Sequence, residues 1–279
     1  MIIKNLKDIN LFHSHNYKSV GFVPTMGNLH LGHLSLIKES LKENQVTVIS
    51  IFVNPKQFGE VKDLEEYPRT LEADMNKANA LLNEYPGKEI FYFIPENEEV
   101  IYPSDFSDYV SIEHLCSISE GETRPGHFDG VATVVHRLFN LIKPQNAYFG
   151  IKDYQQFLVV KALVKLKNHP VKIIGMPIVR EEDGLAMSSR NIHLDKAQRI
   201  ESLDLSQTLL NILLILQTQG LEIARGFIKE KLKDTRFNYL EIRNSDSFEL
   251  AIIEDTNFVI LGNLQLGTVR LLDNVEVMI

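Results

Sequence analysis

The chain has 279 residues and a formal net charge of −8 at pH 7; 44% of its residues are hydrophobic and 24% are charged. This composition is typical of a globular protein, and the acidic balance argues against nucleic-acid binding, which calls for a basic surface. The single cysteine, Cys116, excludes an internal disulfide and a thiolate zinc cage. No apolar run approaches the roughly 18 residues that span a bilayer. We therefore expect a cytoplasmic protein that binds neither nucleic acid nor membrane.

The first part of the chain alternates predicted strands with predicted helices. Strands are predicted at residues 20–23, 46–53, 90–94, 147–149 and 171–175, and helices at 30–44, 69–83, 130–143 and 153–167. The second strand, VTVISIFV, is almost continuously apolar, as in a parallel sheet that is covered on both faces. This pattern predicts an α/β fold with a Rossmann-like, doubly wound parallel sheet, in which ligands bind beyond the carboxyl ends of the strands.

The pattern changes near residue 178. Helical periodicity covers residues 195–219 and 221–233, and short alternating strands are predicted at 237–244, 248–253, 257–264 and 269–274. We therefore predict two domains: residues 1–178, and a smaller C-terminal α+β domain at 179–279.

The stretch TMGNLHLGH lies where the first predicted strand gives way to a helix. Gly27 and Gly32 allow a tight turn and a close approach to a ligand, and His30 and His33 share one face of the first helical turn. The unpaired N–H groups at a helix N-terminus favour an anion, and imidazoles can stabilise charge that grows on a phosphate. The alternative is a histidine pair that only caps a surface helix.

Two later stretches carry similar chemistry. In MSSRN, Ser188 and Ser189 lie beside Arg190, whose guanidinium can donate two hydrogen bonds to a phosphate. In GIKDYQQ, which also begins a helix after a strand, Lys152 supplies positive charge and Asp153 can cap the helix. Taken alone, MSSRN would more often be a solvated loop, and the alternative for Asp153 is capping of the helix and nothing more.

Together with FVNPKQFG at 52–59 and RPGHFDGV at 124–131, these stretches make the sequence resemble the pantothenate synthetase family over its full length. That family comprises ATP-dependent pantoate–β-alanine ligases of the HxGH nucleotidyltransferase superfamily. The resemblance implies the substrates pantoate, β-alanine and ATP, the cofactor Mg²⁺, and a homodimer. It also implies a reaction through an enzyme-bound pantoyl adenylate, with release of pyrophosphate and AMP.

The resemblance also implies roles for individual residues. His33, His30, Lys152 and Arg190 would be catalytic, and His33 would protonate the departing group. The ATP site would comprise Met26, Gly27, Asn28, Leu29, His30, Leu31, Gly32, His33, Gly150, Ile151, Lys152, Asp153, Val179, Met187, Ser188, Ser189 and Arg190. The pantoate and β-alanine site would comprise Gln57, Gln156, Asn54, Arg124 and His127.

The resemblance implies only one protein ligand for magnesium, Asp74. Ala73 stands where some family members carry a second acidic residue. The alternative is that ATP oxygens and water hold the ion, as is common for magnesium.

Three other functions remain to be compared with the ligase. The first is another HxGH adenylyltransferase that acts on a phosphate ester, and the second is a tRNA-binding module, which the acidic composition disfavours. The third is a catalytically inactive nucleotide-binding protein, against which the intact His30, His33, Lys152 and Arg190 argue. A loop that closes over the reactive adenylate is also expected, and the polar run at 181–184 is its predicted mobile segment.

Overall fold

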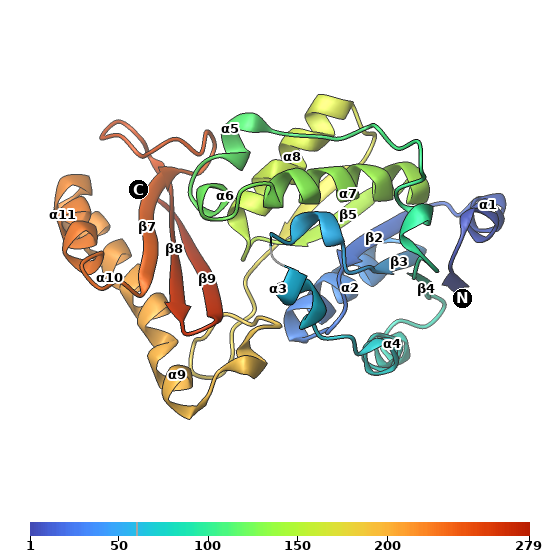
Figure 1. Ribbon diagram of the computed structural model, residues 1–279, viewed down its shortest axis with the longest axis horizontal. Helices are drawn as coiled ribbons and strands as arrows, with labels where there is room; N and C mark the ends of the chain where they lie inside the picture. Colours follow the sequence, from blue (N-terminus) through green and yellow to red (C-terminus); the bar gives the residue numbers. More distant parts are fainter. Residues whose placement is uncertain (60) are drawn as a thin grey trace. The chain divides into compact units, whose positions relative to one another are not determined.

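The computed structural model describes residues 1–59 and 61–279. The chain forms two compact units (Figure 1). The first comprises Met1–Ile151 and Gln155–Pro177, and the second comprises Lys152–Tyr154 and Ile178–Ile279. Within the described ranges, no helix has both the length and the apolar character needed to cross a lipid bilayer.

The first unit is built on a six-stranded sheet in which every strand pair is parallel. The spatial order is β1-β4-β3-β2-β5-β6. The strands are β1 (Ile2–Ile3), β2 (Val20–Thr25), β3 (Val46–Ile51), β4 (Glu89–Phe93), β5 (Asn146–Gly150) and β6 (Lys172–Met176). The direction of winding reverses between β2 and β5, which makes that position the switch point where ligands bind in doubly wound sheets. The predicted parallel sheet is therefore confirmed.

Helices pack on both faces of this sheet (Figure 1). The helices of this part of the chain are α1 (Leu6–Ser14), α2 (Leu31–Glu43), α3 (Val61–Glu65), α4 (Leu71–Ala80), α5 (Glu113–Cys116), α6 (Glu120–Thr123), α7 (His127–Ile142) and α8 (Tyr154–Lys167). Three short 3₁₀-helices are η1 (Pro55–Gln57), η2 (Leu81–Asn83) and η3 (Glu98–Val100). The predicted helices at 30–44, 69–83, 130–143 and 153–167 correspond to α2, α4 with η2, α7 and α8.

Alternation along each strand directs side chains to the two faces. Phe22 of β2 lies 6.2 Å, ring centre to ring centre, from Phe139 of α7, and Phe91 of β4 lies 5.2 Å from Phe12 of α1. The next residue along β2, Val23, packs into the opposite cluster with side chains of α2 and α4. Both faces are therefore buried, which explains why the strands are apolar at successive positions.

The second unit packs helices on an antiparallel three-stranded sheet of order β7-β8-β9. Its elements are η4 (Asn191–His193), α9 (Lys196–Glu201), α10 (Leu203–Gln219), α11 (Leu221–Lys231), β7 (Phe237–Asn244), β8 (Asn257–Leu266) and β9 (Val269–Met278). Leu209 and Ile212 of α10 are fully buried in one cluster with Ile260 and Leu264 of β8. This is the predicted α+β architecture.

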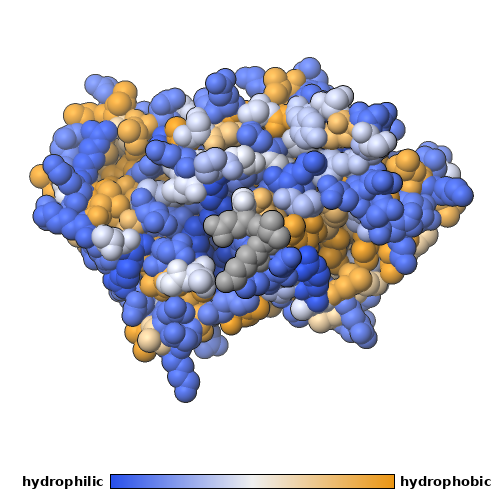
Figure 2. All heavy atoms as spheres, viewed as in Figure 1, coloured by the Kyte–Doolittle hydropathy of each residue, from blue (hydrophilic) through white to orange (hydrophobic). Residues whose placement is uncertain are grey.

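Two predicted elements of the second unit are wrong. The helix predicted at 195–219 is divided at Ser202 into α9 and α10. The strand predicted at 248–253 is a loop that makes a single bridge, from Leu250 to Arg243. Leu250 and Ile253 are 59% and 72% exposed, and apolar surface lies over this loop at the upper left of Figure 2. The alternating pattern predicted a strand, but the pairing of this segment with β7 does not extend beyond that one bridge.

Candidate active site

The loop that joins β2 to α2 reverses sharply at the switch point. Gly27 and Asn28 both have a left-handed backbone, with φ angles of 88° and 50°. The Gly27 N–H donates to Thr25 Oγ1 at 3.1 Å, and Leu29 is only 1% exposed, so the loop is anchored in the core. A side chain at Gly27 would be strained by its φ angle alone, which explains a glycine at this position.

The two histidines of this loop cap α2 and hold each other in place. His30 Nδ1 accepts a hydrogen bond from the Gly32 N–H at 3.1 Å, and His33 Nδ1 accepts one from the His30 N–H at 3.3 Å. Because both donors are backbone N–H groups, each Nδ1 must be unprotonated, and each neutral ring then carries its hydrogen on Nε2. The ring centres lie 4.1 Å apart. The structure thus fixes two adjacent imidazoles as Nε2–H donors.

This arrangement changes one expectation from the sequence. The backbone amides at the start of α2 were expected to bind an anion directly. Instead, the amides of His30 and Gly32 donate to the imidazoles, and the amides of Asn28 and Leu29 donate to Asp74. These four amides therefore have partners within the protein.

Asp74 does not fit its predicted role as a magnesium ligand. Its side chain is fully buried, and its oxygens accept hydrogen bonds from the Asn28 N–H at 2.9 Å, the Leu29 N–H at 2.7 Å and the Thr70 hydroxyl at 3.0 Å. A magnesium ligand would direct an oxygen toward the ion and its water shell. Across residues 1–59 and 61–279, no group of three or more His, Cys, Asp or Glu side chains is arranged to hold a metal.

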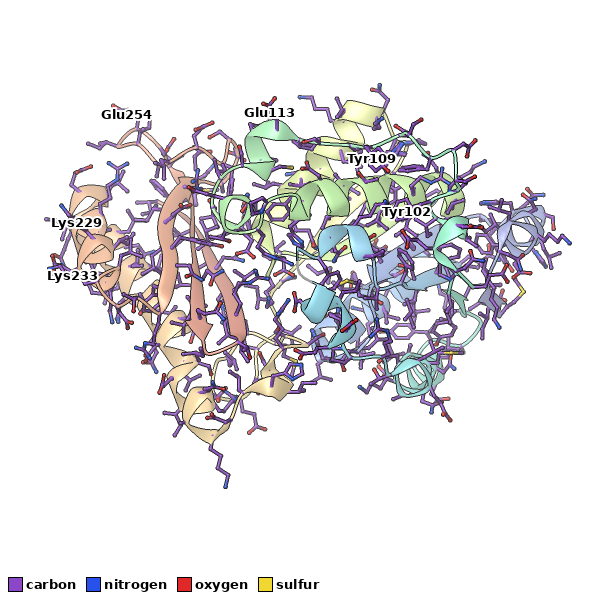
Figure 3. All side chains as sticks on the ribbon, viewed as in Figure 1. Tyr102, Tyr109, Glu113, Lys229, Lys233 and Glu254 are labelled. Atoms are coloured by element: carbon purple, nitrogen blue, oxygen red, sulfur yellow. The ribbon has the colours of Figure 1, made fainter. Side chains whose placement is uncertain are left out.

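A second polar cluster forms where η1 meets α7. Asn54, 1% exposed, donates to Gln57 Oε1 at 3.2 Å and to the Gly130 carbonyl at 3.1 Å, and its own oxygen accepts from the Tyr102 hydroxyl at 2.9 Å. His127 Nδ1 lies 2.8 Å from the Gln57 carbonyl, so Nδ1 is the donor and the neutral ring presents Nε2 as an acceptor. Tyr102 is labelled in Figure 3.

The predicted acid-binding residues converge on this cluster, with one exception. Arg124 approaches the Gln57 carbonyl at 3.5 Å from the loop before α7. Gln57 Nε2 lies 2.9 Å from Met26 Sδ, so the cluster joins the histidine loop directly. Gln156 comes instead from the first turn of α8, half-buried beside Gln155.

Gly150 and Ile151 complete the predicted residues of the first unit. Gly150 ends β5, the strand that pairs with β2 across the switch point. The Ile151 N–H donates to the Met176 carbonyl at 2.9 Å, so the chain leaves the sheet beside the end of β6. Both residues therefore lie at the same carboxyl edge as the histidine loop.

Lys152 and Asp153 differ from the sequence prediction, because Lys152–Tyr154 belongs to the second unit. The Asn274 side chain donates to the Lys152 carbonyl at 2.8 Å, and the Tyr154 hydroxyl donates to Glu276 Oε1 at 2.9 Å. Lys152 Nζ lies 3.1 Å from Asp153 Oδ1. Strand β9 thus sets the position of Lys152.

The remaining predicted nucleotide residues, Val179 and Met187 to Arg190, lie in the second unit on a folded-back loop. The Met187 N–H donates to the Val179 carbonyl at 2.9 Å, and Ser188 Oγ accepts from the Arg190 N–H at 3.2 Å. Ser189 follows within the same turn before η4. The loop is tied to β9 by a two-pronged ion pair, in which Arg180 contacts both oxygens of Asp273 at 2.7 and 2.9 Å.

The segment at 181–184, which was expected to be mobile, is tied down in this structure. Arg199 of α9 pairs with Glu181 at 2.7 Å and with Asp183 at 2.6 Å. The hydrogen bond from Arg199 lowers the pKa of the Asp183 carboxyl below its usual value. The Asn191 side chain also donates to Glu181 at 2.7 Å.

Several supporting residues escaped the sequence analysis. Asp273 and Asn274 are 4% and 3% exposed, yet both are polar. Their only signal in the sequence was the pair DN at the end of an otherwise apolar strand pattern, VRLLDN. Lys77, whose amine donates to the Leu29 carbonyl at 2.7 Å, gave no signal of its own.

The sheet topology and the capped histidine pair define an α/β protein of the HxGH nucleotidyltransferase type. A family model described as Pantoate-beta-alanine ligase matches residues 1–276, and the chain belongs to this family. Its activity is the ATP-dependent condensation of pantoate with β-alanine. Membership of this family favours the ligase over the three alternatives considered from the sequence: an adenylyltransferase that acts on a phosphate ester, a tRNA-binding module and an inactive nucleotide-binding protein.

Individual relatives agree along nearly their whole length. The chain is 43% identical to the pantothenate synthetase of Caldicellulosiruptor bescii, with 99% of this chain and 97% of the relative covered, and 40% identical to that of Aquifex aeolicus, with 99% of each covered. A pantothenate synthetase structure from Thermus thermophilus superposes with a TM-score of 0.88 at 39% identity, covering 100% and 99% of the chains. The Francisella tularensis ligase, complexed with "Beta-gamma ATP" and β-alanine, gives 0.74 at 33% identity, covering 99% and 97%.

Proposed function

We propose that this chain condenses pantoate with β-alanine through an enzyme-bound pantoyl adenylate. In the first step a pantoate carboxylate oxygen bonds to the α-phosphorus of ATP, and the bond to pyrophosphate breaks. In the second step the β-alanine amine bonds to the acyl carbon, loses a proton and releases AMP. Both nucleophiles belong to substrates, so the protein contributes position and charge rather than a covalent intermediate.

The observation that supports this proposal most directly is the fixed tautomer of His30 and His33. Two Nε2–H donors at the switch point can stabilise the charge that gathers on the phosphates as pyrophosphate leaves. His33 would assist the departing pyrophosphate by donating a hydrogen bond from Nε2. Lys152 and Arg190 are proposed as positive partners of the phosphates, the role that the family resemblance implies for them.

Pantoate is proposed to bind at the η1–α7 cluster. The neutral Gln57 amide can donate to a carboxylate, and His127 Nε2 can accept from a hydroxyl group. Gln156 is proposed to reach the same substrate from α8. The Met26–Gln57 contact supports an acid site next to the nucleotide loop, as in-line attack on the α-phosphorus requires.

Three further features belong to this proposal. Magnesium, when bound with ATP, would neutralise phosphate charge, held by ATP oxygens and water because Asp74 is committed to the histidine loop. The chain is proposed to act in the cytoplasm, which agrees with a single cysteine, and as a homodimer, which the family resemblance supports.

Exchange of labelled pyrophosphate into ATP tests the proposed first step. Exchange should require pantoate and should not require β-alanine, and exchange that depends on another acid would reassign the substrate.

His33→Ala should slow adenylate formation in a single turnover by about 10²-fold or more, the usual loss when a transition-state donor is removed. His15→Ala is the control, because His15 is an exposed residue at the end of α1. Equal rates for both variants would exclude His33 from the reaction.

Adjacent glutamines on α8 test the acid site. Gln155 is buried and donates to the Leu115 and Ile118 carbonyls at 2.6 and 2.8 Å, so Gln155→Ala should lower stability. Gln156→Ala should leave stability unchanged and raise the pantoate KM far more than the ATP KM. Equal effects on the two KM values would remove Gln156 from the pantoate site.

A further inference from the structure

Helix α4 holds the histidine loop through a buried carboxylate. Asp74 Oδ2 accepts from the Asn28 N–H at 2.9 Å, and Asp74 Oδ1 accepts from the Leu29 N–H at 2.7 Å. Thr70 donates its hydroxyl to Oδ2 at 3.0 Å. Two successive backbone amides therefore point at one carboxylate, the arrangement in which backbone commonly surrounds an anion.

A second side chain of α4 also bonds to the backbone of the histidine loop. Lys77, one helical turn beyond Asp74, donates from Nζ to the Leu29 carbonyl at 2.7 Å. The N–H and the C=O of Leu29 are thus both bonded to side chains of α4. Because His30 follows directly, the position of its backbone N–H, the group that orients His33, depends on these hydrogen bonds.

The hydrogen bonds from α4 stabilise a loop whose backbone is strained. Asn28 has a φ of 50°, a left-handed conformation that costs a residue with a side chain more than it costs glycine. Strain of this kind persists only where surrounding contacts determine the conformation. Asp74 bonds to the amide of the strained residue itself, so it supplies that contact directly.

We propose that Asp74 and Lys77 are positioning residues for adenylate formation: they set the place of the His30–His33 pair, and Asp74 contributes no ligand to magnesium. This inference rests on the proposed function of the pair. It predicts that disturbing α4 reduces the rate of the first step although neither residue contacts a substrate.

Asp74→Asn is the sharpest test, because the change preserves shape. Both carboxylate oxygens accept from backbone N–H groups, so an amide must turn its NH₂ toward one of these donors. One loop amide is then left facing another donor. We expect kcat for pantoate-dependent adenylate formation to fall by about 10- to 100-fold, the scale of a displacement near 1 Å. Lys77→Met, which keeps the apolar stem, should lower it by about 3- to 10-fold.

The matched control is Glu72→Gln, which removes one negative charge from an exposed position of the same helix. It should retain the wild-type rate. Rates are normalised to folded protein by thermal unfolding and active-site titration, so that a loss of folded enzyme does not count as a loss of rate. If Asp74→Asn does not fold, Lys77→Met carries the test, because Lys77 is an exposed side chain whose loss spares the core.

Magnesium titration separates positioning from metal binding. For Asp74→Asn the magnesium concentration that gives half-maximal rate should change by less than about 2-fold, while kcat falls. Recovery of the rate at high magnesium would overturn the inference, and so would wild-type kcat in both variants. If wild-type protein and Glu72→Gln show no pantoate-dependent exchange, the proposed function has failed rather than the positioning role of α4.

Discussion

Gly130 of α7 lies close against the backbone of η1, and a methyl group there should displace the proposed pantoate site. A Cβ at this position would lie 2.2 Å from the Lys56 carbonyl oxygen and 2.8 Å from Gln57 Cα. Both are backbone atoms, so no side-chain rotation relieves the clash. Non-bonded contacts need about 3.5 Å, so η1 would have to move away by roughly 1.3 Å.

The effects of Gly130→Ala on stability and on binding are expected to differ. Alanine gains about 1 kcal/mol in helix propensity over glycine, whereas overpacking costs about 1–3 kcal/mol. The free energy of unfolding should therefore fall by no more than about 2 kcal/mol. Pantoate binding should be weakened more, because Asn54 donates to the Gly130 carbonyl and His127 donates to the Gln57 carbonyl, so a shift of η1 displaces all three side chains. A displacement near 1 Å lowers rates by about 10²-fold, and we expect that loss in kcat/KM for pantoate.

The assay is pantoate titration of pyrophosphate exchange, combined with urea unfolding. Gly226→Ala is the control: it is the same change in α11, where an added Cβ would meet no atom within 4 Å. It should raise the free energy of unfolding by about 0.5–1 kcal/mol and leave the pantoate KM unchanged. Wild-type pantoate kinetics in Gly130→Ala would refute both the packing argument and the placement of the acid site.

Two further outcomes follow from buried polar groups. The ring nitrogens of His136 lie 2.7 Å from Asp108 Oδ2 and 2.7 Å from His169 Nε2. The pKa of His169 is lowered below its usual 6.5, mainly because the ring is buried and also because His136 and Lys167 are positively charged neighbours. The unfolded chain therefore binds a proton at His169 more readily than the folded chain does. The free energy of unfolding, measured with urea, should be highest above pH 6.5 and should decline as the pH falls below it. A free energy of unfolding that stays constant down to about pH 5.5 would contradict this. In the second unit, Asp273→Ala deprives the Arg180 guanidinium of its carboxylate and should cost about 1–3 kcal/mol of unfolding free energy, whereas an unchanged urea midpoint would exclude a stabilising role.

The fold was predictable where local pattern and tertiary environment agree. The segment at 46–53 is apolar at successive positions because both faces of β3 are covered, and together with the alternation of strands and helices it indicated a parallel sheet. Strand β1 gave no signal, since it consists of Ile2 and Ile3 and exists through its pairing with β4. The segment at 248–253 had the pattern of a strand but lacked a partner to extend its single bridge.

The site shows the same division. Sequence alone indicated the turn, the glycine and the histidine pair of TMGNLHLGH, because the chemistry of a helix N-terminus is local. Through the family resemblance it also predicted binding roles for the Ser-Ser-Arg segment and for the polar residues that meet where η1 joins α7. The resemblance implied Asp74 as a magnesium ligand, whereas the hydrogen bonds of Asp74 to the histidine loop gave no signal in the sequence.

Sequence by itself therefore determined the order of the longer strands and helices, the α/β class, the family and the residue types available for chemistry. Only the tertiary structure decided that Asp74 and Lys77 hold Leu29, that His30 and His33 carry their hydrogens on Nε2, and that β9 positions Lys152. The physical reason is the range of the interactions. Backbone propensity and hydrophobic periodicity act within a few residues, whereas these hydrogen bonds join segments that only the fold brings together.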